Sequence, residues 1–127
     1  MALSKAERNQ QIDRSLAELA SLRGVTTAAI VDSDGFVTHI RRDFEVDTDA
    51  LGAAVQIMFN AAHSAATQLA QNNTKIILAE NKDGLVLLAP LAREFVLTLV
   101  ADGSAMLGTL RFELKESVVE LNTVLNS

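Results

Sequence analysis

The sequence of 127 residues contains no cysteine, no tryptophan and no tyrosine. Without cysteine, the chain has neither a disulfide framework nor a thiolate metal site, and a reducing compartment is compatible with it. Five phenylalanines are the only aromatic residues, and they make up 4% of the chain. Because aromatic rings commonly anchor ligands and stack on bases, this scarcity argues against a nucleobase or sugar site.

Positive charge and long apolar runs are also scarce. Lys and Arg number 11 against 16 Asp and Glu, which gives a net charge of −5 and makes nucleic acid and anionic membranes poor partners. Residues 1–13 are polar and lack a signal-peptide core, so we expect a cytoplasmic protein. Residues 50–71 are uncharged but rich in amide and hydroxyl side chains, which predicts no membrane insertion.

What remains is an ordinary globular composition, with 49% hydrophobic and 21% charged residues in a chain of one-domain length. Hydrophobic periodicity and turn signals predict helices over residues 4–22, 48–71 and 105–125. They predict strands over residues 25–31, 36–41, 75–80, 85–89 and 95–101. The order α-β-β-α-β-β-β-α, with strands grouped in hairpins, indicates an α+β domain with an antiparallel sheet.

Two glycine-containing motifs resemble ligand loops but are incomplete. Asp32, Asp34 and Gly35 begin like a calcium loop, yet the later ligands are missing, which favours a hairpin turn. Gly103 and Gly108 have the spacing of a phosphate loop without its lysine, so we expect Ser104, after Gly103, to cap the last helix instead.

The remaining polar candidates do not form a catalytic set. His39 and His63 lie in different elements, with no metal-ligand spacing, and are predicted to be surface or interface residues. Arg41 and Arg42 could serve as an arginine finger, but a solvated strand edge is favoured. The acidic segment 43–49 is expected to be a solvated loop that could steer a basic partner. We therefore predict no catalytic residue, no metal site and no cofactor.

The most informative segment is the uncharged middle helix. At 100° per residue, one of its sides is expected to lie on the sheet, formed by Leu51, Val55, Met58, Ala62, Ala65 and Leu69. The far side is polar yet uncharged and carries Ala53, Gln56, Asn60, Ser64, Thr67 and Gln71, with Ile57 and Ala61 on its flank. Solvent-facing helices usually carry Lys and Glu, whereas interface cores are depleted in charge. This pattern favours a protein interface over an alanine-rich exposed helix.

The third predicted strand supports the same conclusion. Its apolar residues do not alternate with polar ones, so both faces are expected to be covered. A two-fold dimer could cover them by pairing helix with helix and strand with strand. The predicted dimer or partner interface comprises Ala53, Gln56, Ile57, Asn60, Ala61, Ser64, Thr67, Ile76, Ile77 and Leu78.

From about Leu19 to Leu125 the sequence resembles the Roadblock family, named for a dynein light chain, whose bacterial members regulate Ras-like small GTPases. The resemblance is carried by the order and spacing of several segments, namely residues 22–25, 29–37, the alanine-rich helix, 81–84, 95–100 and 106–111. One departure is Thr27, where the family often has glycine.

The resemblance implies a single Roadblock-like domain over residues 1–127, with its core at about 19–125 and with 1–18 largely an N-terminal helix. It implies a five-stranded sheet with the middle helix on one face and the terminal helices on the other. It also implies a homodimer formed through the middle helix and third strand. By resemblance, the function is that of a non-enzymatic regulator or scaffold that binds a small GTPase.

Such a regulator would modulate the nucleotide cycle or localisation of the GTPase. Some bacterial relatives activate GTP hydrolysis without contributing an arginine, and relatives act in cell polarity and motility. The alternatives are a small-molecule sensor and a general protein-interaction module of similar shape.

Overall fold

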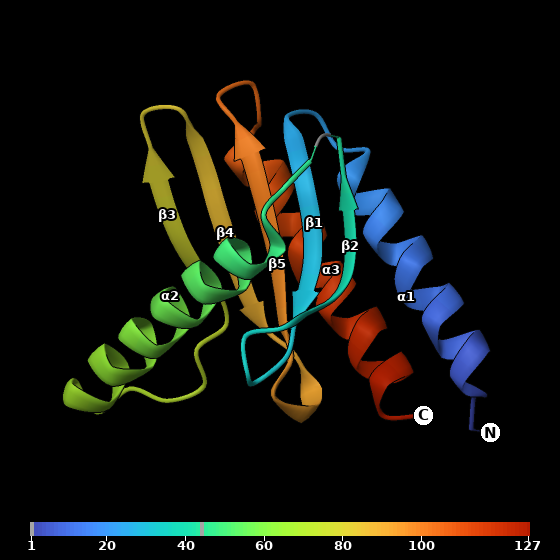
Figure 1. Ribbon diagram of the computed structural model, residues 1–127. Coiled ribbons are helices and arrows are strands. Elements are labelled where there is room, and N and C mark those ends of the chain that lie inside the picture. Colours follow the sequence, from blue (N-terminus) through green and yellow to red (C-terminus); the bar gives the residue numbers. More distant parts are fainter. Residues whose placement is uncertain (1, 44) are drawn as a thin grey trace.

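The computed structural model describes residues 2–43 and 45–127. The helices and strands follow the predicted order, with the bounds α1 (Lys5–Ala20), β1 (Val25–Val31), β2 (Val37–Arg42), α2 (Thr48–Gln68), β3 (Ile77–Asn81), β4 (Gly84–Pro90), η1 (Ala92–Glu94), β5 (Val96–Asp102) and α3 (Leu107–Leu125). The short 3-10 helix η1 was not expected from the sequence. Figure 1 shows the arrangement of these elements.

The sheet has the strand order β2-β1-β5-β4-β3, and all neighbouring strands are antiparallel. β5 enters between the two hairpins and is buried on both faces, which is why its sequence is an almost continuous apolar run. The register of β1 against β5 shifts between Val25 and Thr27, and Thr27 itself is buried. The five-stranded antiparallel α+β fold is therefore confirmed.

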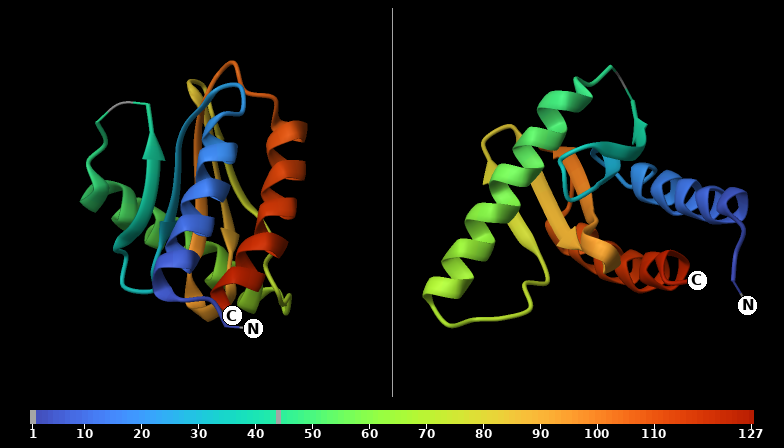
Figure 2. Two further views of the ribbon diagram at one scale, coloured as in Figure 1. Left: turned by 90° about the vertical axis from the view of Figure 1, so that its right-hand side faces the viewer. Right: turned by 60° about the horizontal axis from the view of Figure 1, so that its bottom comes forward.

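Helices α1 and α3 cover one face of the sheet and α2 crosses the other, as the two views of Figure 2 show. α1 begins with the predicted capping box: the Glu7 amide donates to Ser4 Oγ, and the Ser4 amide donates to a Glu7 carboxylate oxygen, both at 3.1 Å. These hydrogen bonds with Ser4 lower the pKa of Glu7.

The two faces have cores of very different size. The face under α1 and α3 contains eighteen buried apolar residues, among them Leu16, Leu97 and Leu114, which are fully buried. The face under α2 contains four, namely Val31, Val55, Leu88 and Val96. Because burial of apolar surface is the main stabilising term, α1 and α3 are held much more firmly than α2.

Near the start of α3 the structure corrects one expectation. The N-cap residue of α3 is Met106, which makes no side-chain capping bond, so Ser104 does not cap this helix. Instead the Ser104 amide and hydroxyl donate to the Asp102 carboxylate, because the chain turns sharply between β5 and α3. The hydroxyl bond is the main cause of the lowered pKa of Asp102. In the described part of the chain, no helix has the length and apolar character needed to cross a membrane.

Candidate interaction surface

Helix α2 is formed by a clear start signal followed by strong helix formers. Asp47 is the N-cap, and its carboxylate accepts a hydrogen bond from the Ala50 amide at 3.1 Å. Asp49 adds negative charge in the first turn, where the helix dipole favours it. The helix ends before Ala70, whose left-handed backbone, with a φ of 57°, stops the helical repeat.

Only Gly52 and Val55 are buried among the 21 residues of α2. Both lie in its first half, which rests on the sheet. The second half extends past β3 and overhangs the edge of the sheet (Figure 1). Ala65 and Leu69, which were expected to lie on the sheet, are therefore exposed, and Leu69 is 70% exposed. Periodicity identified the correct side of the helix but not where the sheet beneath it ends.

The far side of α2 is open to solvent along most of its length. Ile57, a large apolar side chain in the middle of the helix, is 70% exposed. Its exposed neighbours in the predicted interface are Ala53, Asn60, Ala61, Ser64 and Thr67. Among these, the Thr67 hydroxyl donates to the His63 carbonyl at 3.0 Å and so stays within its own helix. The structure thus brings these six residues onto one uncharged surface, which we call the α2 face.

Gln56 differs from the rest of the predicted interface. It is half-buried, and its side-chain amide donates to the Ser33 carbonyl at 2.7 Å. This bond ties α2 to the turn between β1 and β2. The turn itself is held by Asp32, whose carboxylate accepts from the amides of Asp34 and Phe36, both at 2.9 Å. The Asp32–Gly35 segment therefore acts as a hairpin turn, with Gly35 at a φ of 85°.

Strand β3 forms one edge of the sheet, since β4 is its only neighbour among the described strands. The three predicted residues here divide between the faces. Ile76 packs on the core under α1 and α3, Ile77 packs on the cluster under α2, and Leu78 is 39% exposed. An edge strand of this kind presents unpaired amide and carbonyl groups to a partner strand. The C-terminal half of α2 lies beside the β3 edge of the sheet (Figure 1).

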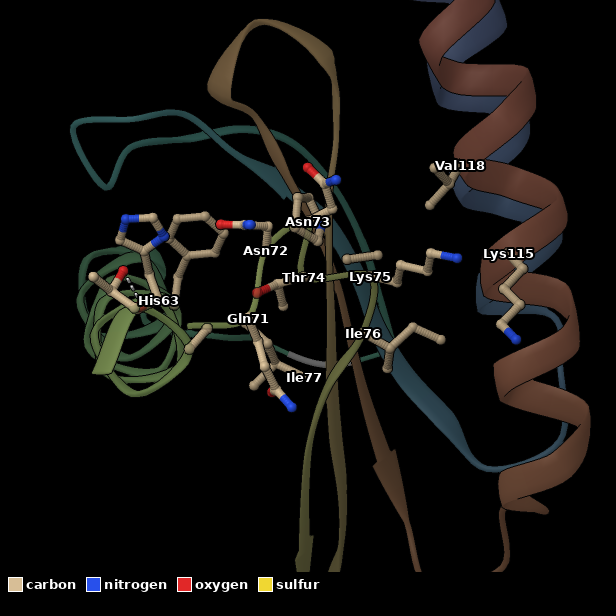
Figure 3. A pocket seen from close by; sticks show the side chains of 15 residues that line it. His63, Gln71, Asn72, Asn73, Thr74, Lys75, Ile76, Ile77, Lys115 and Val118 are labelled. Carbon is tan, nitrogen blue, oxygen red and sulfur yellow. Dashed lines mark hydrogen bonds between the residues drawn. The ribbon is translucent and has the colours of Figure 1, made fainter. Parts of the chain in front are cut away.

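Two overlapping depressions lie at the C-terminal end of α2. The larger, of about 640 Å³, is lined by α2, by the loop at 71–76 and by α3, and Figure 3 shows it from close by. On the α2 side, the rings of Phe59 and His63 stack with their centroids 6.4 Å apart. The second, of about 620 Å³, is lined by Lys75, Arg111 and Lys115, and none of its lining residues is acidic.

Sequence reasoning did not identify this group of three basic side chains. Arg111 and Lys115 are one turn apart on α3, but Lys75 precedes β3 and is far away in sequence. Only the packing of α3 behind the β3 edge brings them together. No periodicity or spacing in the sequence signals that arrangement.

The other polar side chains singled out from the sequence contact their near neighbours in the fold. His39 is half-buried on β2, with Nε2 3.1 Å from Asn9 Oδ1. Burial lowers its pKa, and the nearby charge of Asp13 opposes that shift. Arg42 Nη2 lies 3.6 Å from Glu45 Oε2, an ion pair expected for a strand edge beside the acidic loop. Within the described residues, no three His, Asp or Glu side chains are arranged to hold a metal ion.

Comparison with known proteins places this geometry in context. Residues 11–101 match a family model described as the Roadblock/LC7 domain. MglB of Myxococcus xanthus superposes with a TM-score of 0.87 at 17% identity, over 99% of this chain and 95% of that chain. The gliding protein MglB of Thermus thermophilus superposes with a TM-score of 0.85 at 20% identity, over 98% of this chain and 94% of that chain.

A Roadblock/LC7 domain from Streptomyces avermitilis superposes with a TM-score of 0.82 at 17% identity, over 91% of this chain and 98% of that one. No curated protein sequence matches the chain. The sequence match spans most of the chain, and the structural likeness covers nearly all of it. At these identities the structural likeness bears on the fold.

Proposed function

Because the chain belongs to the Roadblock/LC7 family, we propose that it is a non-enzymatic, homodimeric regulator or scaffold. It binds a Ras-like small GTPase and modulates the nucleotide cycle or the localisation of that GTPase. The GTPase partner follows from the family resemblance, since bacterial members regulate small GTPases. The dimer is supported by the residues exposed on α2 and at the edge of the sheet.

The observation that carries the dimer is the uncharged, exposed α2 face. Ile57, which is 70% exposed, and the small and polar side chains around it lie on a helix with two buried residues of its own. A second copy placed against α2 and along the β3 edge would cover these side chains and pair the free strand edge. Small side chains such as Ala53, Ala61 and Ser64 allow two helices to approach closely.

This function requires binding rather than chemistry from the chain. Arg41 and Arg42 lie at the end of β2, both exposed, and Arg42 already faces Glu45. An arginine finger must instead be held towards a transferring phosphoryl group. A regulator of this kind would act by positioning the catalytic groups of the GTPase or by holding the GTPase in place.

The dimer is tested by sedimentation of two matched variants. Ile57→Glu places a carboxylate in the proposed interface, where it would be buried without a partner. Val119→Glu makes the same change at an equally exposed position, also 70%, on the outer side of α3. We expect the Ile57 variant to be monomeric at micromolar concentration, and the Val119 variant to remain dimeric like the wild type. Equal masses for both variants would contradict the proposed interface.

The partner is tested with a purified Ras-like small GTPase. It is loaded with GDP or with a non-hydrolysable GTP analogue and passed over the immobilised protein. We expect capture that depends on the bound nucleotide. A dimer that captures the GTPase in neither state, and leaves its GTP hydrolysis rate unchanged, would contradict the regulatory role.

A further inference from the structure

A third cavity, of about 480 Å³, lies beneath the middle of α2. Its walls come from α2, from the turn between β1 and β2, and from the segment that joins β4 to β5. Its lining includes no residue of β3, so it is separate from the sheet edge at which a second copy is proposed to pair. Clefts that hold small organic molecules commonly have volumes of about 300–1,000 Å³, and this cavity falls within that range.

The floor of this cavity is apolar. Val31, Val55 and Val96 line it, and they are three of the four buried residues in the small core under α2. Phe59 adds an aromatic ring to the wall, and that ring stacks on His63. The cavity therefore continues the core of the thinner layer of the molecule. A ligand with an apolar body would be stabilised here, because it would remove this floor from water.

The charged groups of the lining all carry the same sign. Asp32 and Glu94 contribute carboxylates, and the lining contains no Lys or Arg. One Asp32 oxygen already accepts hydrogen bonds from two amides of the β1–β2 turn. Glu94 is exposed, and in residues 2–43 and 45–127 the one ion pair found joins Arg42 to Glu45, so Glu94 has no cationic partner there. A cationic group on a ligand would pair with the Glu94 carboxylate.

A strained stretch of backbone places Glu94 at this cavity. Arg93 and Glu94 are adjacent residues with φ of 62° and 65°, a left-handed conformation that residues other than glycine rarely adopt. The Arg93 Nη1 donates to the Leu125 carbonyl at 3.3 Å, at the end of α3, whereas Glu94 lines the cavity under α2. Since α3 and α2 cover opposite faces of the sheet (Figure 2), the left-handed pair directs two consecutive side chains to opposite layers.

We propose that this cavity binds a small organic cation, an amine or guanidine carried on an apolar body. The body lies on the valine floor beside Phe59, and the cationic group lies beside Glu94. A single Lys or Arg side chain of a protein partner would leave much of the 480 Å³ unfilled, which favours a free small molecule. The site is formed within one chain and does not depend on the proposed dimer or its GTPase. Asn60 lines the cavity and belongs to the α2 face, so the ligand contacts that face from beneath.

The test uses three probes of similar shape and different charge, namely 4-phenylbutylamine, 4-phenylbutanol and 4-phenylbutyrate. Calorimetric titration of the full chain measures their affinities. We expect the amine to bind about fivefold more tightly than the alcohol, and the carboxylate to bind most weakly. Glu94→Gln keeps the shape of the side chain and removes its charge, so the amine should then bind no more tightly than the alcohol. Glu116→Gln is the matched control, since Glu116 is exposed on α3 across the sheet, and it should leave all three affinities unchanged.

Amide chemical shifts in nuclear magnetic resonance spectra show where the amine binds. We expect changes at Ser33, Asn60 and Glu94, which line the cavity on three different elements. Equal affinity for the three probes, or an unchanged preference for the amine in Glu94→Gln, would overturn the proposal. Tighter binding of N-acetyl-lysine methylamide than of 4-phenylbutylamine would also overturn it, because the cavity would then suit a lysine side chain of a protein partner.

Discussion

Gly52 of α2 lies directly against the backbone of Gly35 in the β1–β2 turn. A Cβ atom at position 52 would overlap the Gly35 carbonyl oxygen, and one at position 35 would stand 2.8 Å from the Gln56 side chain. Gly35 also needs its left-handed backbone, with a φ of 85°. These two glycines allow α2 to approach the sheet at the one place where its residues are buried.

We therefore expect Gly52→Ala to destabilise the protein. The atom in the way belongs to the backbone and cannot rotate aside, so α2 would have to lift from the turn, at a cost of about 1–3 kcal/mol. Urea unfolding followed by circular dichroism measures this change. Gly108→Ala is the matched control, since a Cβ there meets nothing within 4 Å in α3. It should raise the free energy of unfolding by about 0.5–1 kcal/mol through helix propensity, and an equal loss in both variants would contradict the explanation.

Thr98 offers a test of the centre of the sheet. It is fully buried in β5, and its hydroxyl has no hydrogen-bond partner among the described residues. Thr98→Val replaces that hydroxyl by a methyl group of the same shape, and we expect a gain of about 1 kcal/mol in the free energy of unfolding. Thr26→Val should act in the opposite direction, because the Thr26 hydroxyl donates to the Val100 carbonyl at 3.2 Å. A loss of stability in both variants would show that the Thr98 hydroxyl is bonded after all.

His39 is expected to make stability depend on pH. Burial lowers its pKa in the folded chain below the ordinary value of 6.5, so the folded state prefers the neutral ring. Well above pH 6.5 both states are neutral and His39 adds no pH dependence. As the pH falls below that value the unfolded chain takes up a proton that the folded chain resists, and stability is lost.

Urea unfolding at a series of pH values from neutral to mildly acidic measures this effect. His39→Gln keeps an amide near Asn9 but cannot titrate, so its stability should fall less over the same range. All other titrating groups are common to the two proteins, and the difference between the curves therefore isolates His39. A steeper fall in the variant than in the wild type would contradict the direction of the shift.

The fold was largely predictable because each element carries its own local signal. Ser4 and Glu7 mark the start of α1, and Asp32 to Gly35 mark the first hairpin. The five-stranded sheet and the faces on which the helices lie agree with the resemblance. The start of α3 was harder to predict from the sequence. Serine is a favoured N-cap residue, but the Ser104 hydroxyl donates a hydrogen bond to the Asp102 carboxylate instead.

The candidate interaction surface was predictable only in part, because some of it depends on tertiary packing that the sequence pattern does not encode. Periodicity identifies which side of α2 carries no charge, and it correctly leaves Ile57 outside the core. It cannot indicate how far the sheet extends beneath the helix, and Leu69 is exposed on that account. The basic group at Lys75, Arg111 and Lys115 depends wholly on tertiary packing. Gln56 also required the structure, since its bond to Ser33 spans 23 positions of sequence.

Because α2 overhangs the sheet, it is held by fewer buried contacts than α1 and α3. The layer of α1 and α3 is a complete core with eighteen buried apolar residues, whereas the α2 layer has four. Regions with few buried contacts open first by local unfolding, while the rest of the fold stays closed. We therefore expect the backbone amides of α2 to exchange hydrogen faster than those of β5. A partner that covers the helix should slow the exchange of α2 and leave that of β5 unchanged.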